Sequence, residues 1–207
     1  MRIIAGQRRG HKFDGPQGGD TRPTSDLVRE SLFNILGDLV ADRVVVDLFA
    51  GTGALGLEAL SRGAARALFV EQNRDNVALI YRNLATLRYE DRGRVQATDA
   101  YRWVRSFTAI DDEPIVVFLD PPYRAYDDRP RKVNQLLLRL VEKLPPDSVI
   151  AVESSRALDS QILPDVDAWD VRRYGGTQIA IRALARATEP EPGPSSPRGE
   201  ESPDAPR

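Results

Sequence analysis

The feature that most restricts the fold of this chain is a regular alternation of apolar runs and amphipathic stretches between residues 43 and 155. Five runs are expected to form strands: 43–50, 66–72, 114–120 and 148–155, which are largely apolar, and the shorter run 94–100. Stretches with helical periodicity separate them, at 54–63, 74–87, 101–107 and 132–144. Strands that are apolar on both faces and alternate with helices predict a mostly parallel sheet covered on both sides. We therefore expect a three-layer α/β sandwich.

Segments on either side of this alternation complete the expected sheet and its cover. Residues 24–40 have the amphipathic pattern of a helix that starts just after Pro23. Near the other end, residues 169–176 and 177–184 have the pattern of two strands joined by a glycine turn. This hairpin brings the expected sheet to seven strands, mostly parallel and closed by an antiparallel hairpin.

The limits of the expected domain follow from a change of composition near residue 188. Residues 188–207 hold six prolines and no Val, Ile, Leu, Met or aromatic residue. Such a segment cannot bury enough apolar surface to offset its chain entropy, so we expect an acidic, proline-rich, disordered tail. Residues 1–187 are expected to form one domain, in which 1–40 are an N-terminal arm and helix.

Two residue counts argue against whole classes of active site. The chain has no cysteine, which excludes disulfides, thiolate metal sites and cysteine nucleophiles. Its single histidine, His11, argues against histidine-based metal centres and Ser-His-Asp hydrolysis. No apolar run approaches the roughly 18 residues of a membrane span, and the N-terminus lacks the apolar core of a secretory signal. We expect a cytoplasmic monomer with no metal and no membrane partner.

The first expected strand runs into a glycine-rich loop, DLFAGTGALG. There Gly51, Gly53 and Gly56 fit G-x-G-x-x-G between a strand and a helix, so the backbone can turn tightly and approach a ligand closely. Glu71 ends the next strand, where an acid accepts hydrogen bonds from ribose hydroxyls. Both NAD, with its pyrophosphate on the helix N-terminus, and S-adenosylmethionine (SAM) fit this geometry, and the loop alone does not choose between them.

Further cofactor-binding candidates lie close to these groups in the sequence. Asp99 follows the third strand and can accept a hydrogen bond from an exocyclic adenine amine, which both cofactors possess. A structural role for Asp99, as the N-cap of the helix at 101–107, explains the residue equally well. Asp47 and Phe49 border the glycine loop and Ala100 adjoins Asp99, so we count these three residues as candidates too.

The fourth expected strand ends in Asp120-Pro121-Pro122-Tyr123. In a doubly wound sheet this strand lies beside the first, which predicts Asp120 at the carboxyl edge next to the glycine loop. The Asp120 carboxylate and the Pro121 carbonyl can each accept one hydrogen of a nucleobase amine, which improves the nitrogen as a nucleophile for methyl transfer from SAM. Pro122 fixes φ and aims that carbonyl, and Tyr123 offers a stacking ring worth roughly 1–3 kcal/mol. We expect these four residues to be catalytic; a rigid turn is the structural alternative.

The whole chain has a net charge of −2, but its N-terminal residues are basic. Residues 1–22 hold five basic and two acidic residues, a net charge of +3. Arg8, Arg9 and Lys12 are therefore candidates for contacting RNA phosphates. A solvated, flexible start explains the same charges, and charge alone does not decide between the two.

Six motifs together resemble a known family: MRIIAGQRRGHKF, TRPTSDLVRESLFNIL, VDLFAGTGALGLEALSRGA, FVEQN, DPPY and RYGGTQIAI. Over residues 1–184 the chain is similar to bacterial ribosomal RNA guanine-N2 methyltransferases of the RsmD type. The first two motifs are the specific ones, because the other four occur more widely among methyltransferases. The acidic, proline-rich tail departs from the family pattern.

The resemblance has implications of its own. It implies a Rossmann-like, class I SAM-dependent methyltransferase fold whose seventh strand is antiparallel. It implies methylation of a guanine N2 amine in 16S ribosomal RNA, either free or in a small-subunit assembly intermediate. It also implies that Arg22, Pro23 and Thr24, ahead of the first helix, help to close the SAM pocket.

Three alternatives stay open on the sequence. Asp-Pro-Pro-Tyr also occurs in enzymes that methylate adenine N6 in DNA, although the chain leaves little room for a separate DNA-recognition domain. An NAD-dependent oxidoreductase would be expected to show a hydride-transfer acid or base, such as a Tyr-x-x-x-Lys pair, and none is apparent. A nucleic-acid-binding protein without activity is disfavoured by the intact Asp120 and Tyr123.

Overall fold

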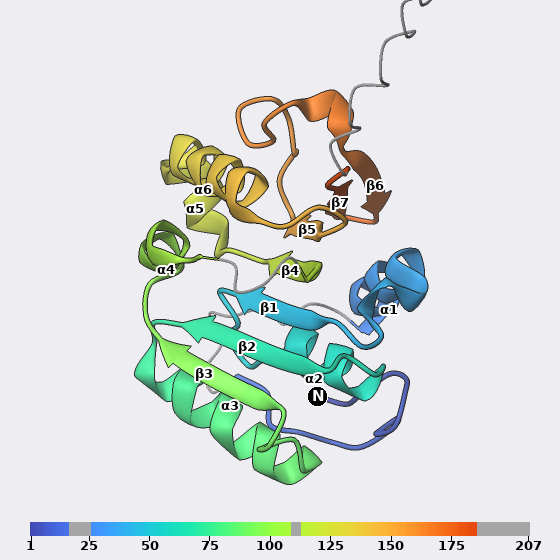
Figure 1. Ribbon diagram of the computed structural model, residues 1–207. Coiled ribbons are helices and arrows are strands. Elements are labelled where there is room, and N and C mark those ends of the chain that lie inside the picture. The colour runs from blue at the N-terminus through green and yellow to red at the C-terminus, as the bar shows by residue number, and fades with distance from the viewer. Residues whose placement is uncertain (17–25, 109–112, 186–207) are drawn as a thin grey trace, which may run out of the picture.

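The computed structural model describes residues 1–16, 26–108 and 113–185, and its centre is one seven-stranded sheet. The strand order is β3-β2-β1-β4-β5-β7-β6 (Figure 1). The strands are β1 Val44–Leu48, β2 Arg66–Glu71, β3 Gly93–Ala97, β4 Ile115–Leu119, β5 Val149–Ser154, β6 Asp170–Tyr174 and β7 Thr177–Ala183. Strands β1 to β5 pair in parallel, whereas β7 is antiparallel to both β5 and β6. The expected mostly parallel sheet with an antiparallel closing hairpin is confirmed.

Helices cover both faces of this sheet. Their bounds are α1 Asp26–Leu36, α2 Ala54–Ser61, α3 Arg74–Leu87, α4 Ala100–Ser106, α5 Tyr123–Asp128 and α6 Pro130–Lys143. Buried side chains of α1, α2 and α3 share one apolar core with the sheet, and those of α4, α5 and α6 share the other. The three-layer sandwich is therefore confirmed, with one core on each side of the sheet.

Strand β4 shows why its sequence is apolar without a break. All five of its residues are buried. Val116 and Phe118 point into the α1–α3 core, and Ile115, Val117 and Leu119 point into the α4–α6 core. A central parallel strand with helices on both faces has no solvent side, so alternation of apolar and polar residues is lost.

Several elements differ in length from the sequence expectation. The helix expected over 24–40 is α-helical over Asp26–Leu36 and continues as a 3-10 turn, Gly37–Val40. The third strand ends at Ala97, because the chain leaves the sheet before Asp99 caps α4. Helix α5 was not expected at all, since six residues are too few to show a helical period. A second 3-10 turn, Val166–Ala168, precedes β6.

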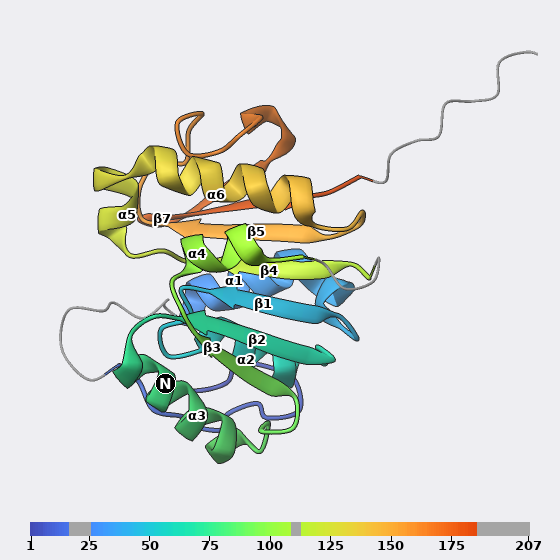
Figure 2. The ribbon, with the colours of Figure 1, turned by 60° about the vertical axis from the view of Figure 1, so that its left-hand side comes forward.

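The first sixteen residues pack against α2 and α3 (blue in Figures 1 and 2). Ile3 and Phe13 are buried in the α1–α3 core. The carboxylate of Glu58, itself fully buried on α2, accepts hydrogen bonds from the backbone N–H groups of Ile4 and Ala5. The flexible start that charge alone allowed is thus wrong for residues 1–16.

Candidate functional site

The parallel strand order brings the carboxyl ends of β3, β2, β1, β4 and β5 to one edge of the sheet. Figure 2 shows these five strands side by side in that order. Four of the expected acids stand at this edge or just below it: Asp99 after β3, Glu71 at the end of β2, Asp47 in β1 and Asp120 after β4. Ligands of open α/β sheets bind at this edge, so the expected site residues gather where the fold predicts them.

The glycine loop joins β1 to α2 and is shaped by close packing. Gly53 has φ of +80°, a left-handed conformation that favours glycine. A Cβ atom on Gly56 would lie 2.3 Å from a ring carbon of Phe69 on β2, so only glycine lets α2 pack this closely on the sheet. Phe49 adopts a left-handed φ of +60°, which is uncommon for a residue with a side chain.

Two buried carboxylates hold this loop. Oδ2 of Asp47 accepts a hydrogen bond of 2.9 Å from the Gly56 N–H, in the first turn of α2. The two oxygens of Glu71 accept from the Gly51 N–H at 2.8 Å and the Asn73 N–H at 2.7 Å. Both side chains are more than nine-tenths buried. Bracing by these carboxylates is a structural role that the sequence pattern did not predict.

The carboxylates of this site influence one another. The pKa of Asp47 is raised well above its ordinary value, first because the group is buried and then because Asp120 and Glu71 are also acids. The hydrogen bond from Gly56 acts in the opposite direction. Asp120 and Glu71 therefore both lie within electrostatic reach of Asp47.

Asp99 lies at the start of α4. Its Oδ1 accepts a hydrogen bond of 2.8 Å from the Arg102 N–H, so the expected N-cap role is present. Ala100 is buried beside it. The rings of Phe49 and Tyr101 meet edge to face, with centroids 5.5 Å apart, which joins the loop after β1 to the start of α4. Phe49, Asp99 and Ala100 thus belong to one corner of the edge.

The catalytic candidates continue directly from β4 into α5. Asp120 is half-buried, Pro121 is buried and Pro122 is exposed. Pro122 has φ of −58° and stands as the N-cap of α5, where its carbonyl accepts a hydrogen bond of 2.7 Å from the Ala125 N–H. Tyr123 is the first residue of α5; the described part of the structure does not include its side chain.

Helix α5 is fixed to the end of β5 by residues that the sequence analysis missed. Tyr126 is buried, and its hydroxyl donates a hydrogen bond of 2.7 Å to the Glu153 carbonyl. Asp127 forms a bidentate ion pair with Arg156, in which the shortest nitrogen–oxygen distance is 2.8 Å. The three-residue spacing from Tyr123 to Tyr126 is compatible with one face of a helix, but so short a segment does not by itself predict a helix. These contacts position the segment that follows Asp120.

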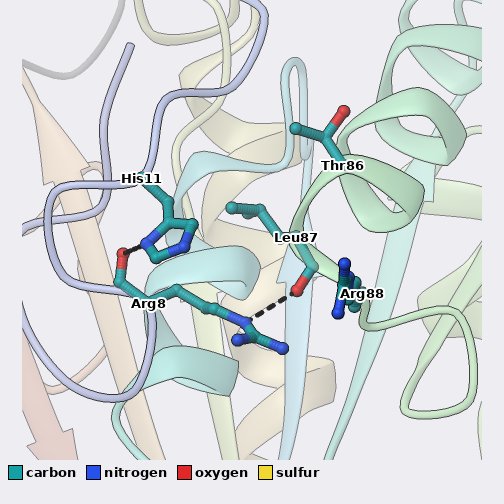
Figure 3. Close-up of a pocket in the computed structure, with 5 residues that line it drawn as sticks. All are labelled: Arg8, His11, Thr86, Leu87 and Arg88. Carbon is teal, nitrogen blue, oxygen red and sulfur yellow. Dashed lines mark hydrogen bonds between the residues drawn. The ribbon is translucent and has the colours of Figure 1, made fainter.

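The three RNA-contact candidates lie on the packed N-terminal arm. Arg9 and Lys12 are exposed, whereas Arg8 is half-buried. Nε of Arg8 donates a hydrogen bond of 3.0 Å to the Leu87 carbonyl at the end of α3. Figure 3 shows Arg8 and His11 facing Leu87 and Arg88 across a pocket of about 290 Å³.

This pocket lies at the opposite edge of the sheet from Asp120. Helix α3 starts after the carboxyl end of β2 and runs back to the amino end of β3. A helix of 14 residues is about 21 Å long. The tip of the arm and the catalytic candidates are therefore separated by about the length of α3.

Some expectations fall outside the described residues. Arg22, Pro23 and Thr24 lie in the segment 17–25, and the tail expected over 188–207 lies beyond residue 185. Within the described ranges, no cluster of three or more His, Asp or Glu side chains has the arrangement of a metal site. Among the helices of those same ranges, none is both long and apolar enough to span a membrane.

The charges at the glycine loop discriminate between the two cofactors considered. NAD would place a doubly charged pyrophosphate at the N-terminus of α2. The Gly56 N–H there is already bonded to the carboxylate of Asp47, and the Gly51 N–H is bonded to that of Glu71. A pyrophosphate would meet two acids, whereas SAM has no phosphate and, with a sulfonium, an ammonium and one carboxylate, carries a net positive charge. The residues present fit SAM.

Known proteins share this architecture. The family described as Conserved hypothetical protein 95 matches residues 1–183. Ribosomal RNA small subunit methyltransferase D of Escherichia coli strain K12 is 38% identical over 197 residues, which cover 92% of this chain and 92% of that protein. The solved structure of the Escherichia coli protein yhhF has a TM-score of 0.72 at 33% identity, covering 89% of this chain and 98% of that one.

A more distant structure has the same fold. It is an RNA methyltransferase from Salinibacter ruber in complex with S-adenosyl-L-homocysteine, with a TM-score of 0.59 at 19% identity, covering 83% of this chain and 98% of that one. The seven-stranded sheet described above is thus the class I SAM-dependent methyltransferase fold. Since the family match extends over residues 1–183, this chain belongs to the Conserved hypothetical protein 95 family of methyltransferases.

Proposed function

We propose that this protein is a SAM-dependent methyltransferase, acting in the cytoplasm, that methylates the exocyclic N2 amine of a guanine in 16S ribosomal RNA. One observation carries the proposal. Asp120-Pro121-Pro122 follows β4 at the carboxyl edge, beside a glycine loop that is braced by Asp47 and Glu71. An amine-holding group and a loop suited to SAM thus stand next to each other.

The cofactor half of the proposed site lies over β1, β2 and β3. Glu71 would hold the ribose hydroxyls with the lone pairs that its two backbone hydrogen bonds leave available. Asp99 would accept from the adenine amine, and Gly51 and Gly53 would let the backbone approach the amino-acid end. Phe49 and Ala100 would line the pocket, and the resemblance adds Arg22 and Thr24 as groups that close it. When bound, SAM supplies a methyl group on a positively charged sulfur.

The acceptor half uses the segment after β4. The lone pair of the guanine N2 amine is delocalised into the ring, which makes the nitrogen a poor nucleophile. Asp120 would accept one N–H and the Pro121 carbonyl the other, so that the lone pair points at the methyl group. A nitrogen–carbon bond then forms as the sulfur–carbon bond breaks, and the nitrogen gives up one proton, for which Asp120 is the nearest proposed acceptor. Tyr123 would stack on the base.

The choice of RNA rests on two kinds of support. The Escherichia coli relative that covers most of the chain is named for the small-subunit ribosomal RNA. The exposed basic residues Arg9 and Lys12 lie on the arm that packs along α2 and α3. RNA that contacts both the arm tip and Asp120 would run about 20 Å along this side of the molecule.

A methylation assay tests the proposal directly. The protein is incubated with isotope-labelled SAM and either 16S rRNA or small-subunit particles from a strain that lacks the corresponding gene. Nucleoside mass spectrometry is expected to find labelled N2-methylguanosine. Labelled N6-methyladenine in DNA, with none in RNA, would favour the adenine alternative. Tight NAD binding without SAM binding in calorimetry would reject methyl transfer altogether.

A further inference from the structure

Glu153 lies directly beside Asp120 at the carboxyl edge. Strands β4 and β5 pair in register, with Leu119 opposite Val152, so the next residues along the two strands are Asp120 and Glu153. Neighbouring parallel strands are about 4.8 Å apart. Asp120 directly follows β4 and Glu153 is the last residue but one of β5, so the two acids are neighbours across the carboxyl ends of these strands.

Both side chains point to the same face of the sheet. Leu119 and Val152 pack into the α4–α6 core, and the preceding residues, Phe118 and Ala151, pack into the α1–α3 core. Side chains alternate along a strand, so Glu153 projects on the α1–α3 side. Continuing the alternation of β4 by one residue places Asp120 on the same side. Glu153 is half-buried there.

The Tyr126 hydroxyl lies within electrostatic reach of both acids. The Tyr126 hydroxyl, which donates to the Glu153 carbonyl, has its pKa raised by burial, then by the charge of Asp120 and, more weakly, by that of Glu153. Both acids thus act on one buried hydroxyl. That hydrogen bond fixes the backbone of Glu153, and so fixes the point from which its side chain starts.

The strand order assigns Glu153 to the acceptor side of the site. Glu71 and Asp99 belong to β2 and to the end of β3, on one side of β1. Glu153 belongs to β5, on the far side of β4 from them. A base whose amine is held at Asp120 would therefore have Glu153 beside it, away from the groups proposed for the cofactor.

We propose that Glu153 selects guanine by accepting a hydrogen bond from its N1–H while Asp120 accepts from the N2 amine. This inference rests on the proposed function and names the residue that reads the base. In guanine, N1–H and the N2 amine are adjacent donors on the Watson–Crick edge, which match two adjacent carboxylates. In adenine, the atom next to the exocyclic amine is the N1 lone pair, which a carboxylate repels. The Asp-Pro-Pro-Tyr motif does not choose the base; the pair of acids does.

The test uses an RNA whose methylated guanine has first been mapped by mass spectrometry. A synthetic fragment carries at that position either guanosine or 2-aminopurine riboside, which keeps the amine, replaces N1–H with a lone pair and lacks the 6-oxo group; only the change of preference in Glu153→Gln therefore reports on N1. The parent enzyme is expected to prefer guanosine in kcat/KM by at least about tenfold, because a group placed to accept a hydrogen bond meets none. In Glu153→Gln the carboxamide can accept from guanosine or donate to 2-aminopurine, so the preference should fall to about threefold or less.

Controls separate this role from a structural one. Glu142→Gln, an exposed acid on α6, should keep the parent preference. The SAM dissociation constant of Glu153→Gln should equal that of the parent, since the Tyr126 bond uses only the backbone of Glu153. If Glu153→Gln methylates neither fragment, the ratio of the two RNA dissociation constants, measured with S-adenosylhomocysteine present, replaces the kinetic ratio.

The outcomes distinguish this inference from the function on which it rests. A preference in Glu153→Gln equal to that of the parent overturns the role of Glu153 and leaves the methyltransferase proposal intact. A parent enzyme that methylates no guanine in small-subunit RNA overturns the proposed function itself.

Discussion

Asp47 in β1 accepts a hydrogen bond from the backbone N–H of Gly56 in the first turn of α2, at 2.9 Å. The bond connects the two ends of the glycine loop. It places the Asp47 carboxyl group at the N-terminus of α2, where the helix dipole favours a negative charge. Together with the bond from Gly51 to Glu71, it fixes the loop at both ends. The protein's own acids thus set the loop conformation that a cofactor meets.

Asp47→Asn is expected to change how stability depends on pH. The pKa of Asp47 is raised in the folded protein, so between about pH 4, where the unfolded group titrates, and the folded pKa the native state holds the extra proton. The contribution of Asp47 to the free energy of unfolding therefore falls as pH rises through this window. Urea unfolding from pH 4 to pH 8 should show the parent losing stability relative to Asp47→Asn. A difference that does not vary with pH would contradict a buried, titrating Asp47.

Glu71→Ala is expected to weaken SAM binding by about 1.5–3 kcal/mol, the value of hydrogen bonds to a charged group. Because Glu71 also braces Gly51 and Asn73, Glu71→Gln should retain part of both functions through its amide oxygen. Calorimetry measures the SAM dissociation constants, with Asp75→Ala, an exposed acid on α3, as the control. An unchanged constant in a folded Glu71→Ala would limit the residue to a structural role.

Asp120→Ala is expected to lower the methylation rate by roughly 10²–10³, by analogy with the loss of one preorganised transition-state hydrogen bond. Asp120→Asn should retain more activity, since its amide oxygen can still accept from the amine. SAM binding should change much less in both variants. Single-turnover methylation with saturating SAM provides the rates, and an Asp120→Ala rate equal to the parent's would refute the amine-holding role.

Tyr126→Phe tests whether the anchor of α5 positions the catalytic segment. Removing the hydroxyl leaves the Glu153 carbonyl without this donor, which should cost about 1 kcal/mol of unfolding free energy. We expect the methylation rate to fall while the SAM dissociation constant stays unchanged. Tyr81→Phe, on the exposed surface of α3, provides the matched control. Equal rates for both variants would show that α5 keeps its place without the bond.

Arg9→Ala with Lys12→Ala tests the arm without disturbing Arg8, whose Nε bonds to α3. Each lost phosphate contact should flatten the log–log salt dependence of RNA affinity by roughly 0.7. The control replaces Arg105 and Arg139, which are exposed on α4 and α6 over the other face of the sheet. RNA affinity titrations at several salt concentrations give the slopes, and a slope equal to the parent's would place the arm outside the RNA footprint.

The sequence by itself determined the parts of this protein that depend on local pattern. Largely apolar runs predicted β1, β2, β4 and β5, because strands covered on both faces are mostly apolar, while β3 is a more polar edge strand. Gly175-Gly176 predicted the turn between β6 and β7. The spacing of Gly51, Gly53 and Glu71 predicted a ligand loop and its acid. These signals are contained in short segments, so they needed no knowledge of the partners.

Only the tertiary structure decided which groups act together. Strand order and register brought Glu153 beside Asp120, although the two positions are 33 apart in the chain. Packing turned a basic N-terminal segment into a fixed arm held by Glu58, and bonded the two buried acids to the glycine loop. Such contacts join residues distant in the chain, and their geometry depends on how the strands pair and the helices pack. For that reason composition and spacing identified the acids, and the folded sheet decided what each one contacts.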